Sequence, residues 1–77
     1  MIAREHVYAA LREVLETGAF DDDTALVALG DSLALVAIVM ELEVRLDLQI
    51  PDGTELAWTS VGDVVRWAER ATERRLS

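Results

Sequence analysis

Residues 31–52 read DSLALVAIVMELEVRLDLQIPD, and this stretch decides the fold that the sequence predicts. The residues from Ser32 to Met40 carry no charge, whereas the turns that follow mix charged and apolar residues. This pattern favours a helix over 32–46 with one face in a core, and Pro51 prevents its continuation. The residues expected to face inward are Val36, Val39, Met40 and Leu46, and those expected to face outward are Glu41, Glu43 and Arg45.

Two further long helices and a short one are predicted around this segment. The first covers about residues 2–16 and ends before Gly18, which suits the left-handed cap position. Its apolar stripe consists of Val7, Leu11, Val14 and Leu15. The last begins at Ser60, which forms a capping-box pattern with Asp63. Residues 54–57 are long enough for one short helical turn. We therefore expect an all-α fold, a bundle of three longer helices plus a short one.

The long connection between Gly18 and Asp31 is expected to cover the open end of the helices. The apolar residues expected to anchor it are Phe20, Leu26, Val27 and Leu29. Residues 21–23 are three aspartates, which we interpret as a solvated charge run. The alternating ligands and the glycine of an EF-hand calcium loop are missing.

Length and composition limit the class of protein. A chain of 77 residues suits one domain, here residues 1–77. No stretch has the roughly 18 uncharged apolar residues of a membrane span. The N-terminus lacks the basic patch and apolar block of a signal peptide. The chain has no cysteine, which is compatible with the cytoplasm. We expect a cytoplasmic monomer.

Acidic residues dominate the charge of the chain. Fifteen Asp and Glu residues oppose seven Arg residues, and the net charge is −8. Arg45 is the only base between Glu13 and Asp63. Such a surface repels phosphate backbones and anionic membranes, so we expect basic protein surfaces as partners and no nucleic acid. The acidity fits equally well a small domain that charge merely keeps soluble.

The residues that enzymes use most are scarce. His6 is the only histidine, and without cysteine the usual pairs of nucleophile and base cannot be built. The four glycines are scattered and form no phosphate-binding loop. We expect no catalytic residue and no metal site, and hence no enzyme.

A serine stands at the junction between loop and helix. Asp and Ser are both favoured helix N-caps, so Asp31-Ser32 alone needs no functional explanation. Two later segments change this interpretation: residues 50–52 read IPD, and residues 59–61 read TSV.

These segments resemble the acyl carrier protein family, in which a DSL motif opens the second helix and IPD and TSV segments follow at similar spacing. The likeness covers about residues 20–70. It implies a four-helix bundle of acyl-carrier type, in which Ser32 is joined through a phosphodiester to 4'-phosphopantetheine derived from coenzyme A. The arm holds acyl intermediates as thioesters and presents them to biosynthetic enzymes.

The resemblance also implies roles for the neighbours of Ser32. Asp31 would help to position the modifying transferase or its metal ion, and Leu33 would make an apolar contact beside the site. A phosphodiester here would lie at a helix N-terminus, where free N–H groups and the helix dipole favour an anion. The implied partners are a phosphopantetheinyl transferase and acyl-loading, condensing and tailoring enzymes of a fatty-acid-like or polyketide-like pathway.

The chain departs from the family pattern in two ways. Gly30 directly precedes Asp31, where the family motif has one residue between them. Positions of the second helix that are typically acidic in the family are Ala34, Ala37 and Val44 here.

The second departure favours a more hydrophobic partner interface than is usual in the family. We expect Leu35 and Ile38 to bind partner enzymes, while Glu41 and Glu43 mainly steer the encounter.

Two alternatives remain open. An aminoacyl, peptidyl or D-alanyl carrier shares the bundle and the serine, although peptidyl carriers usually have a glycine pair before the site. An unmodified helical interaction module would instead bind through the apolar second helix alone, with no covalent change at Ser32.

Overall fold

The computed structural model describes residues 2–76 and consists of helices joined by loops. The α-helices are α1 (Ile2–Leu15), α2 (Ser32–Leu46) and α3 (Val61–Leu76). Two short 3₁₀ helices, η1 (Leu26–Ala28) and η2 (Thr54–Ala57), lie in the connections. Residues 2–76 contain no β-strand, so the all-α prediction is confirmed. The short helix expected over 54–57 is a single 3₁₀ turn.

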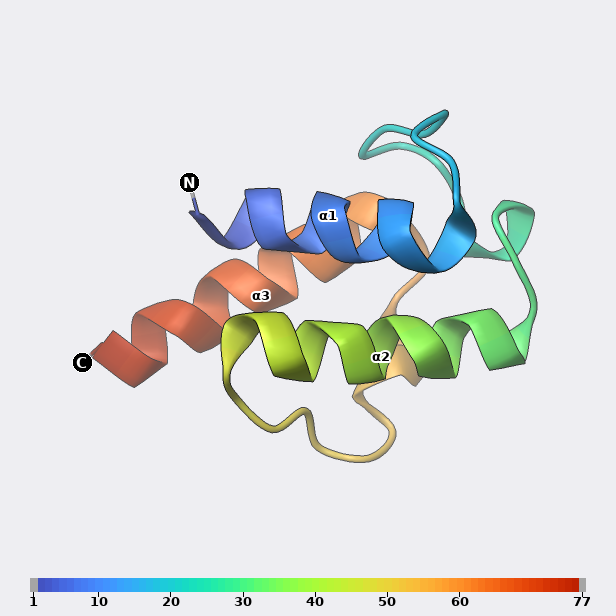
Figure 1. Ribbon diagram of the computed structural model, residues 1–77. Coiled ribbons are helices and arrows are strands. Elements are labelled where there is room, and N and C mark those ends of the chain that lie inside the picture. The colour runs from blue at the N-terminus through green and yellow to red at the C-terminus, as the bar shows by residue number, and fades with distance from the viewer. Residues whose placement is uncertain (1, 77) are drawn as a thin grey trace.

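The helix α1 packs against both α2 and α3 (Figure 1). In Figure 1, α2 runs back beside α1 in the opposite direction, and α3 crosses behind α1. Apolar residues from all three helices meet in the core. The largest fully buried side chains are Leu11, Leu42, Val7, Val61, Val64 and Val65.

The helix α2 begins and ends at the predicted residues, but its first half is rotated relative to the prediction. Its buried residues, Ile38, Leu42 and Leu46, recur at every fourth position. Val36 and Met40, which were expected to face inward, are 51% and 61% exposed. The cause is the uncharged run from Ser32 to Met40, in which no polar residue marks the solvent side.

The ends of two helices follow from local hydrogen bonds. At the start of α3, the Asp63 N–H donates to Ser60 Oγ (3.3 Å) and the Ser60 N–H donates to Asp63 Oδ2 (3.1 Å), which confirms the capping box. At the end of α1, the left-handed residue is Glu16 (φ 56°) and not Gly18. The helix already ends at Leu15, so the cap falls two residues earlier than predicted.

The connection before α2 is anchored largely as expected. Leu26 is buried, and Phe20 and Leu29 pack against the core. Val27 is 89% exposed, so its predicted anchoring role is wrong. The connection also pairs with the segment before α3. The Leu26 N–H donates to Thr59 O (2.9 Å), beside an isolated β-bridge between Ala25 and Ser60.

Asp22, in the middle of the acidic run, is a structural residue and not merely solvated. Its two carboxylate oxygens accept hydrogen bonds from the Arg4 guanidinium, both at 2.7 Å, and Oδ1 also accepts from the Tyr8 hydroxyl. Its carbonyl oxygen accepts from the Gly62 N–H at 2.9 Å. Asp22 therefore ties the long connection to both α1 and α3.

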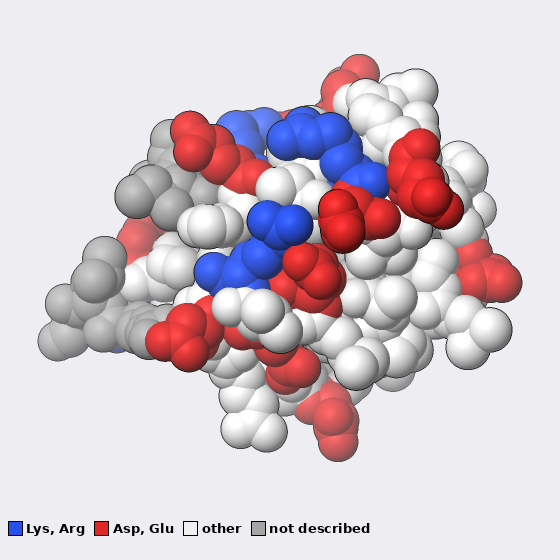
Figure 2. All heavy atoms as spheres, viewed as in Figure 1, with Lys and Arg blue, Asp and Glu red and all other residues white. Residues whose placement is uncertain are grey.

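Two properties of the surface bear on partners. No helix within residues 2–76 has the length and apolar character needed to cross a membrane. On the face seen in Figure 2, acidic side chains are widely spread, whereas the area over the first half of α2 is largely uncharged.

The contacts of Asp22 make the stability of the fold depend on pH. Hydrogen bonds from Arg4 and then Tyr8 lower the pKa of Asp22 from 3.8 to about 2. Because this pKa is lower in the folded state, the carboxylate adds stability above about pH 4, and this is lost as the pH falls towards 2. The side chain is 37% exposed, so solvent screening keeps the effect modest.

We predict that Asp22→Asn lowers the midpoint of thermal unfolding at pH 7 by a few degrees, and that the difference from wild type shrinks between pH 4 and pH 2. Melting curves followed by circular dichroism across this range would measure it. Asp23→Asn is the matched control, because the Asp23 side chain is exposed and makes no ion pair with the side chains described, those of residues 3–74. Equal midpoints for Asp22→Asn and wild type at pH 7 would contradict the prediction.

Candidate functional site

Ser32 is the first residue of α2, and it does not cap the helix. The cap is Asp31, whose Oδ1 accepts a hydrogen bond from the Ala34 N–H (3.0 Å) and whose carbonyl oxygen accepts from the Leu35 N–H (3.1 Å). Ser32 is exposed, and its hydroxyl has no hydrogen-bond partner among residues 3–74, whose side chains the structure describes. The hydroxyl is therefore free for chemistry at no structural cost.

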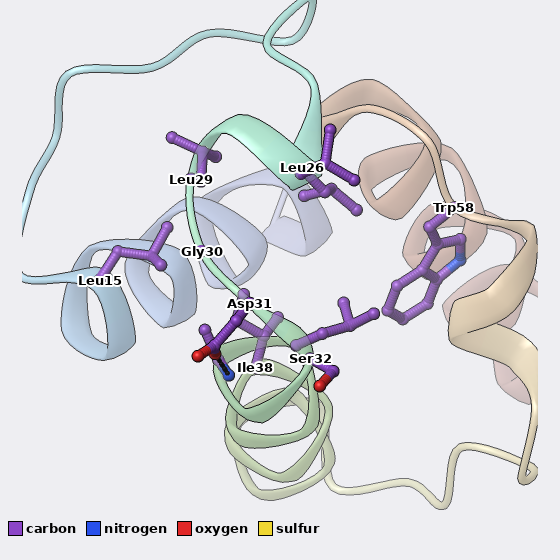
Figure 3. Close-up of a pocket in the computed structure, with 11 residues that line it drawn as sticks. Leu15, Leu26, Leu29, Gly30, Asp31, Ser32, Ile38 and Trp58 are labelled. Carbon is purple, nitrogen blue, oxygen red and sulfur yellow. Dashed lines mark hydrogen bonds between the residues drawn. The ribbon is translucent and has the colours of Figure 1, made fainter.

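An apolar cavity of about 280 Å³ opens beside Ser32 (Figure 3). Side chains of α1, η1, α2 and the segment before α3 form its walls. The labelled apolar residues among them are Leu15, Leu26, Leu29, Ile38 and Trp58. Asp31 and Ser32 lie at its edge on the first turn of α2.

The loop approaches α2 very closely at Gly30. A Cβ atom at this position would lie 2.7 Å from the Cβ of Ala34, which is closer than two such carbons pack. Glycine is thus the residue that allows the chain to pass directly into the Asp31 cap. The short connection between Gly30 and Asp31 is accommodated in this way.

Comparison with known proteins places this site in a family. The family model described as "Phosphopantetheine attachment site" matches residues 5–68. An acyl carrier protein of Clostridium perfringens is 36% identical over 62 residues, which are 80% of this chain and 76% of that protein. The chain belongs to the acyl carrier protein family.

Two other relatives are also acyl carrier proteins. An acyl carrier protein of Sulfurovum sp. is 39% identical over 57 residues, covering 74% of this chain and 71% of its own. An acyl carrier protein of Wolinella succinogenes is 40% identical over 57 residues, which are 74% of this chain and 70% of that protein. No solved structure matches the chain at a significant level. Acyl carrier proteins carry intermediates and do not catalyse reactions, so the protein is not an enzyme.

Membership of the family implies a covalently bound 4'-phosphopantetheine, and the residues around α2 fit such a group. The unpartnered Ser32 hydroxyl can form the ester. The start of α2 offers N–H groups and the positive end of the helix dipole to a phosphodiester. The cavity can receive an apolar group attached further out. When bound, the group supplies a thiol, which a chain without cysteine lacks.

The two apolar residues that were expected to bind partners differ in their exposure. Ile38 is 3% exposed and belongs to the core, so it cannot be a surface contact. Leu35 is half-buried and lines the cavity. Leu33, in contrast, is 77% exposed beside Ser32. The error at Ile38 has the same cause as the rotation of α2: an apolar run does not reveal which side meets solvent.

The two acids that were expected to steer partners both make internal contacts. Glu41 pairs with Arg45 four residues later, at 2.8 Å. Glu43 accepts a hydrogen bond from the Ile50 N–H at 2.9 Å and so holds the start of the next connection. A change at Glu43 would alter the loop as well as the charge.

Sequence reasoning missed Trp58 as a residue of the site. Trp58 is 8% exposed and lines the cavity, although it lies 26 positions after Ser32 in the chain. The one available signal was its place directly before the TSV segment, where a large apolar residue must turn inward as α3 begins.

The geometry predicts different effects of two neighbouring substitutions on stability. Asp31→Ala removes the cap and should destabilise the fold by about 1 kcal/mol, which lowers the unfolding midpoint by several degrees. Ser32→Ala keeps the cap and should leave the midpoint nearly unchanged. Thermal melts of both variants would test this, and a larger loss for Ser32→Ala would mean that the cap is assigned to the wrong residue.

Proposed function

We propose that Ser32 carries 4'-phosphopantetheine and that the protein presents acyl intermediates, held as thioesters on this arm, to biosynthetic enzymes. The observation that carries the proposal is the free, exposed Ser32 hydroxyl at the start of α2, next to an apolar cavity. Asp31 is exposed beside it, and one of its carboxylate oxygens already caps the helix. The other oxygen is the one that would contact the transferase or its metal ion.

The lining of the cavity supports an acyl cargo. Its side chains are almost all apolar, and Asp31 and Ser32 are the polar residues at its edge. An apolar wall stabilises an aliphatic chain by removing its surface from water, by about 25 cal/mol per Å². It offers nothing to the charged amino group of an aminoacyl or D-alanyl cargo, whose burial without a partner is unfavourable. We therefore favour a fatty-acid-like or polyketide-like pathway over those alternatives.

The attachment can be tested directly. After incubation with coenzyme A, magnesium and a broad-specificity phosphopantetheinyl transferase, wild type should gain the mass of one phosphopantetheine. Ser32→Ala should gain none. Intact-protein mass spectrometry measures the gain, and a thiol reagent should label only the modified protein.

Ser60→Ala is the matched control, because the Ser60 hydroxyl accepts a hydrogen bond from the Asp63 N–H and serves the cap of α3. This variant should be modified like wild type. Modification of Ser32→Ala would assign the arm to another residue. A complete lack of modification in wild type would favour an unmodified interaction module.

We further propose that the exposed apolar residues of α2 dock the partner enzymes. They recur three or four positions apart and so follow one side of the helix from Ser32 to its end. We call this surface the α2 stripe; it consists of Leu33, Val36, Met40 and Val44. It takes the place of Leu35 and Ile38 as the candidate apolar contact surface for the transferase and the acyl-loading, condensing and tailoring enzymes.

Charge would then have a secondary role in partner binding. Ala34 and Ala37 leave the beginning of α2 without charge, and Glu43 is occupied by the Ile50 N–H. Exposed charges that remain elsewhere raise the rate of encounter and are screened beyond about 8 Å at physiological ionic strength. Burial of the stripe depends much less on salt.

Two leucines with similar exposure allow a matched test. Leu33, in the α2 stripe, is 77% exposed, and Leu56, on η2, is 83% exposed. We predict that Leu33→Ala lowers kcat/KM for acyl transfer to a partner enzyme about tenfold, with a shallow dependence on salt, while Leu56→Ala changes it little. Transfer kinetics over a salt series would measure both. Equal losses, or abolition of transfer by moderate salt, would contradict recognition by the stripe.

Other features of the proposal follow from the family and the charge. We propose that residues 1–77 form one acyl carrier domain, with η2 as the short fourth helix of the bundle. A net charge of −8 disfavours self-association, which supports a monomer. We place the protein in the cytoplasm, together with the enzymes that it would serve.

A further inference from the structure

Trp58 forms part of the wall of two different cavities. One is the cavity of about 280 Å³ beside Ser32. The other, of about 240 Å³, lies between η2 and α3 and is lined by Thr54, Trp67 and Arg70 among others. Of the residues that line these two cavities, Trp58 is the one they share. Trp58 therefore borders both of them.

The ring is turned so that its six-membered part faces the cavity at Ser32. Figure 3 shows this part pointing towards α2, while the Nε1 edge points away from the cavity. The Ser32 cavity thus meets the hydrocarbon part of the Trp58 ring, and the Nε1 atom lies on the other side.

Packing holds the ring in this position. The Nε1 atom is buried and has no hydrogen-bond partner among the residues that the structure describes. On the far side, Trp67 meets Trp58 edge to face, with ring centroids 5.8 Å apart and planes at 64°. No hydrogen bond fixes the indole, so packing alone holds it in place. The position of this wall therefore depends on the size of the side chain at residue 58.

We propose that Trp58 determines the length of acyl chain that the carrier shelters. This inference rests on the proposed attachment at Ser32. The indole closes the end of the open cavity, so a short or medium chain fits within it, whereas the outer carbons of a longer chain remain in water. A smaller residue at this position would leave free the space that the indole now fills and admit more of the chain.

The size of the open cavity gives an approximate limit. An apolar cavity of about 150 Å³ holds one benzene molecule, so a cavity nearly twice as large should hold on the order of ten carbons. Every carbon that enters the cavity adds buried apolar surface to the folded state and stabilises it, and a carbon that stays outside adds none. Thermal stability should therefore rise with chain length and then level off.

The test uses the modified protein loaded with saturated acyl chains of increasing even length. For wild type, the unfolding midpoint should stop rising at a length on the order of ten carbons. For Trp58→Leu, it should continue to rise for about two further carbons or more, because the smaller side chain leaves space that the surroundings only partly fill. Trp58→Phe, which removes less volume, should give a smaller shift and replaces Trp58→Leu if that variant does not fold.

Val7→Ala is the control for a general loss of core volume, since Val7 is fully buried and lines neither cavity. It should lower the unfolding midpoint but leave unchanged the chain length at which the midpoint stops rising. The inference is overturned if wild type shows no such length, if the Trp58 variants stop rising where wild type does, or if Val7→Ala shifts the length equally. Mass spectrometry of each sample separates these results from a failure of the proposed function, in which no arm would be attached at Ser32.

Discussion

The packing of α2 against α1 is the interaction on which the rest of the molecule depends. Ile38, Leu42 and Leu46 fix the rotation of α2, because side chains four residues apart share one face and all three are buried. That rotation leaves the stripe of Leu33, Val36, Met40 and Val44 outside and directs Leu35 into the cavity. The free hydroxyl, the cavity and the outer apolar surface are thus consequences of one helix orientation.

The sequence was informative where a local interaction determines the structure. Residues 32–46 were placed correctly because a cap at one end and Asp47 and Pro51 at the other limit the helix, and the pairing of Ser60 with Asp63 marked the start of α3. The sequence was uninformative about features that tertiary contacts decide, such as which face of α2 is buried. The uncharged first half of α2 could bury any side, so Val36 and Ile38 were assigned to the wrong faces. The link from Arg4 to Asp22 joins distant segments and leaves no local pattern.

The acidity of the chain is only partly available to partners. Asp22 binds Arg4 and Tyr8, Asp31 caps α2, Glu43 holds the Ile50 N–H, and Asp63 caps α3. Hydrogen bonds from the Thr59 and Ser60 backbone, followed by the Arg66 side chain, lower the pKa of Asp63 to about 2. Carboxylates of this kind stabilise connections and helix ends in a domain that has no disulfide. A count of charges therefore overstates the electrostatic signal of the surface.

The pairing of the two long connections has a mechanical consequence. The Leu26 N–H bonds to Thr59 O, and the Val61 N–H bonds to Thr24 O, so η1 and the segment that carries Trp58 are fastened together on one side of the cavity. The opposite side is the first turn of α2, which reaches η1 through Leu29 and Gly30. The side of the cavity that bears Ser32 is therefore the side that the hydrogen bonds between the two connections do not hold.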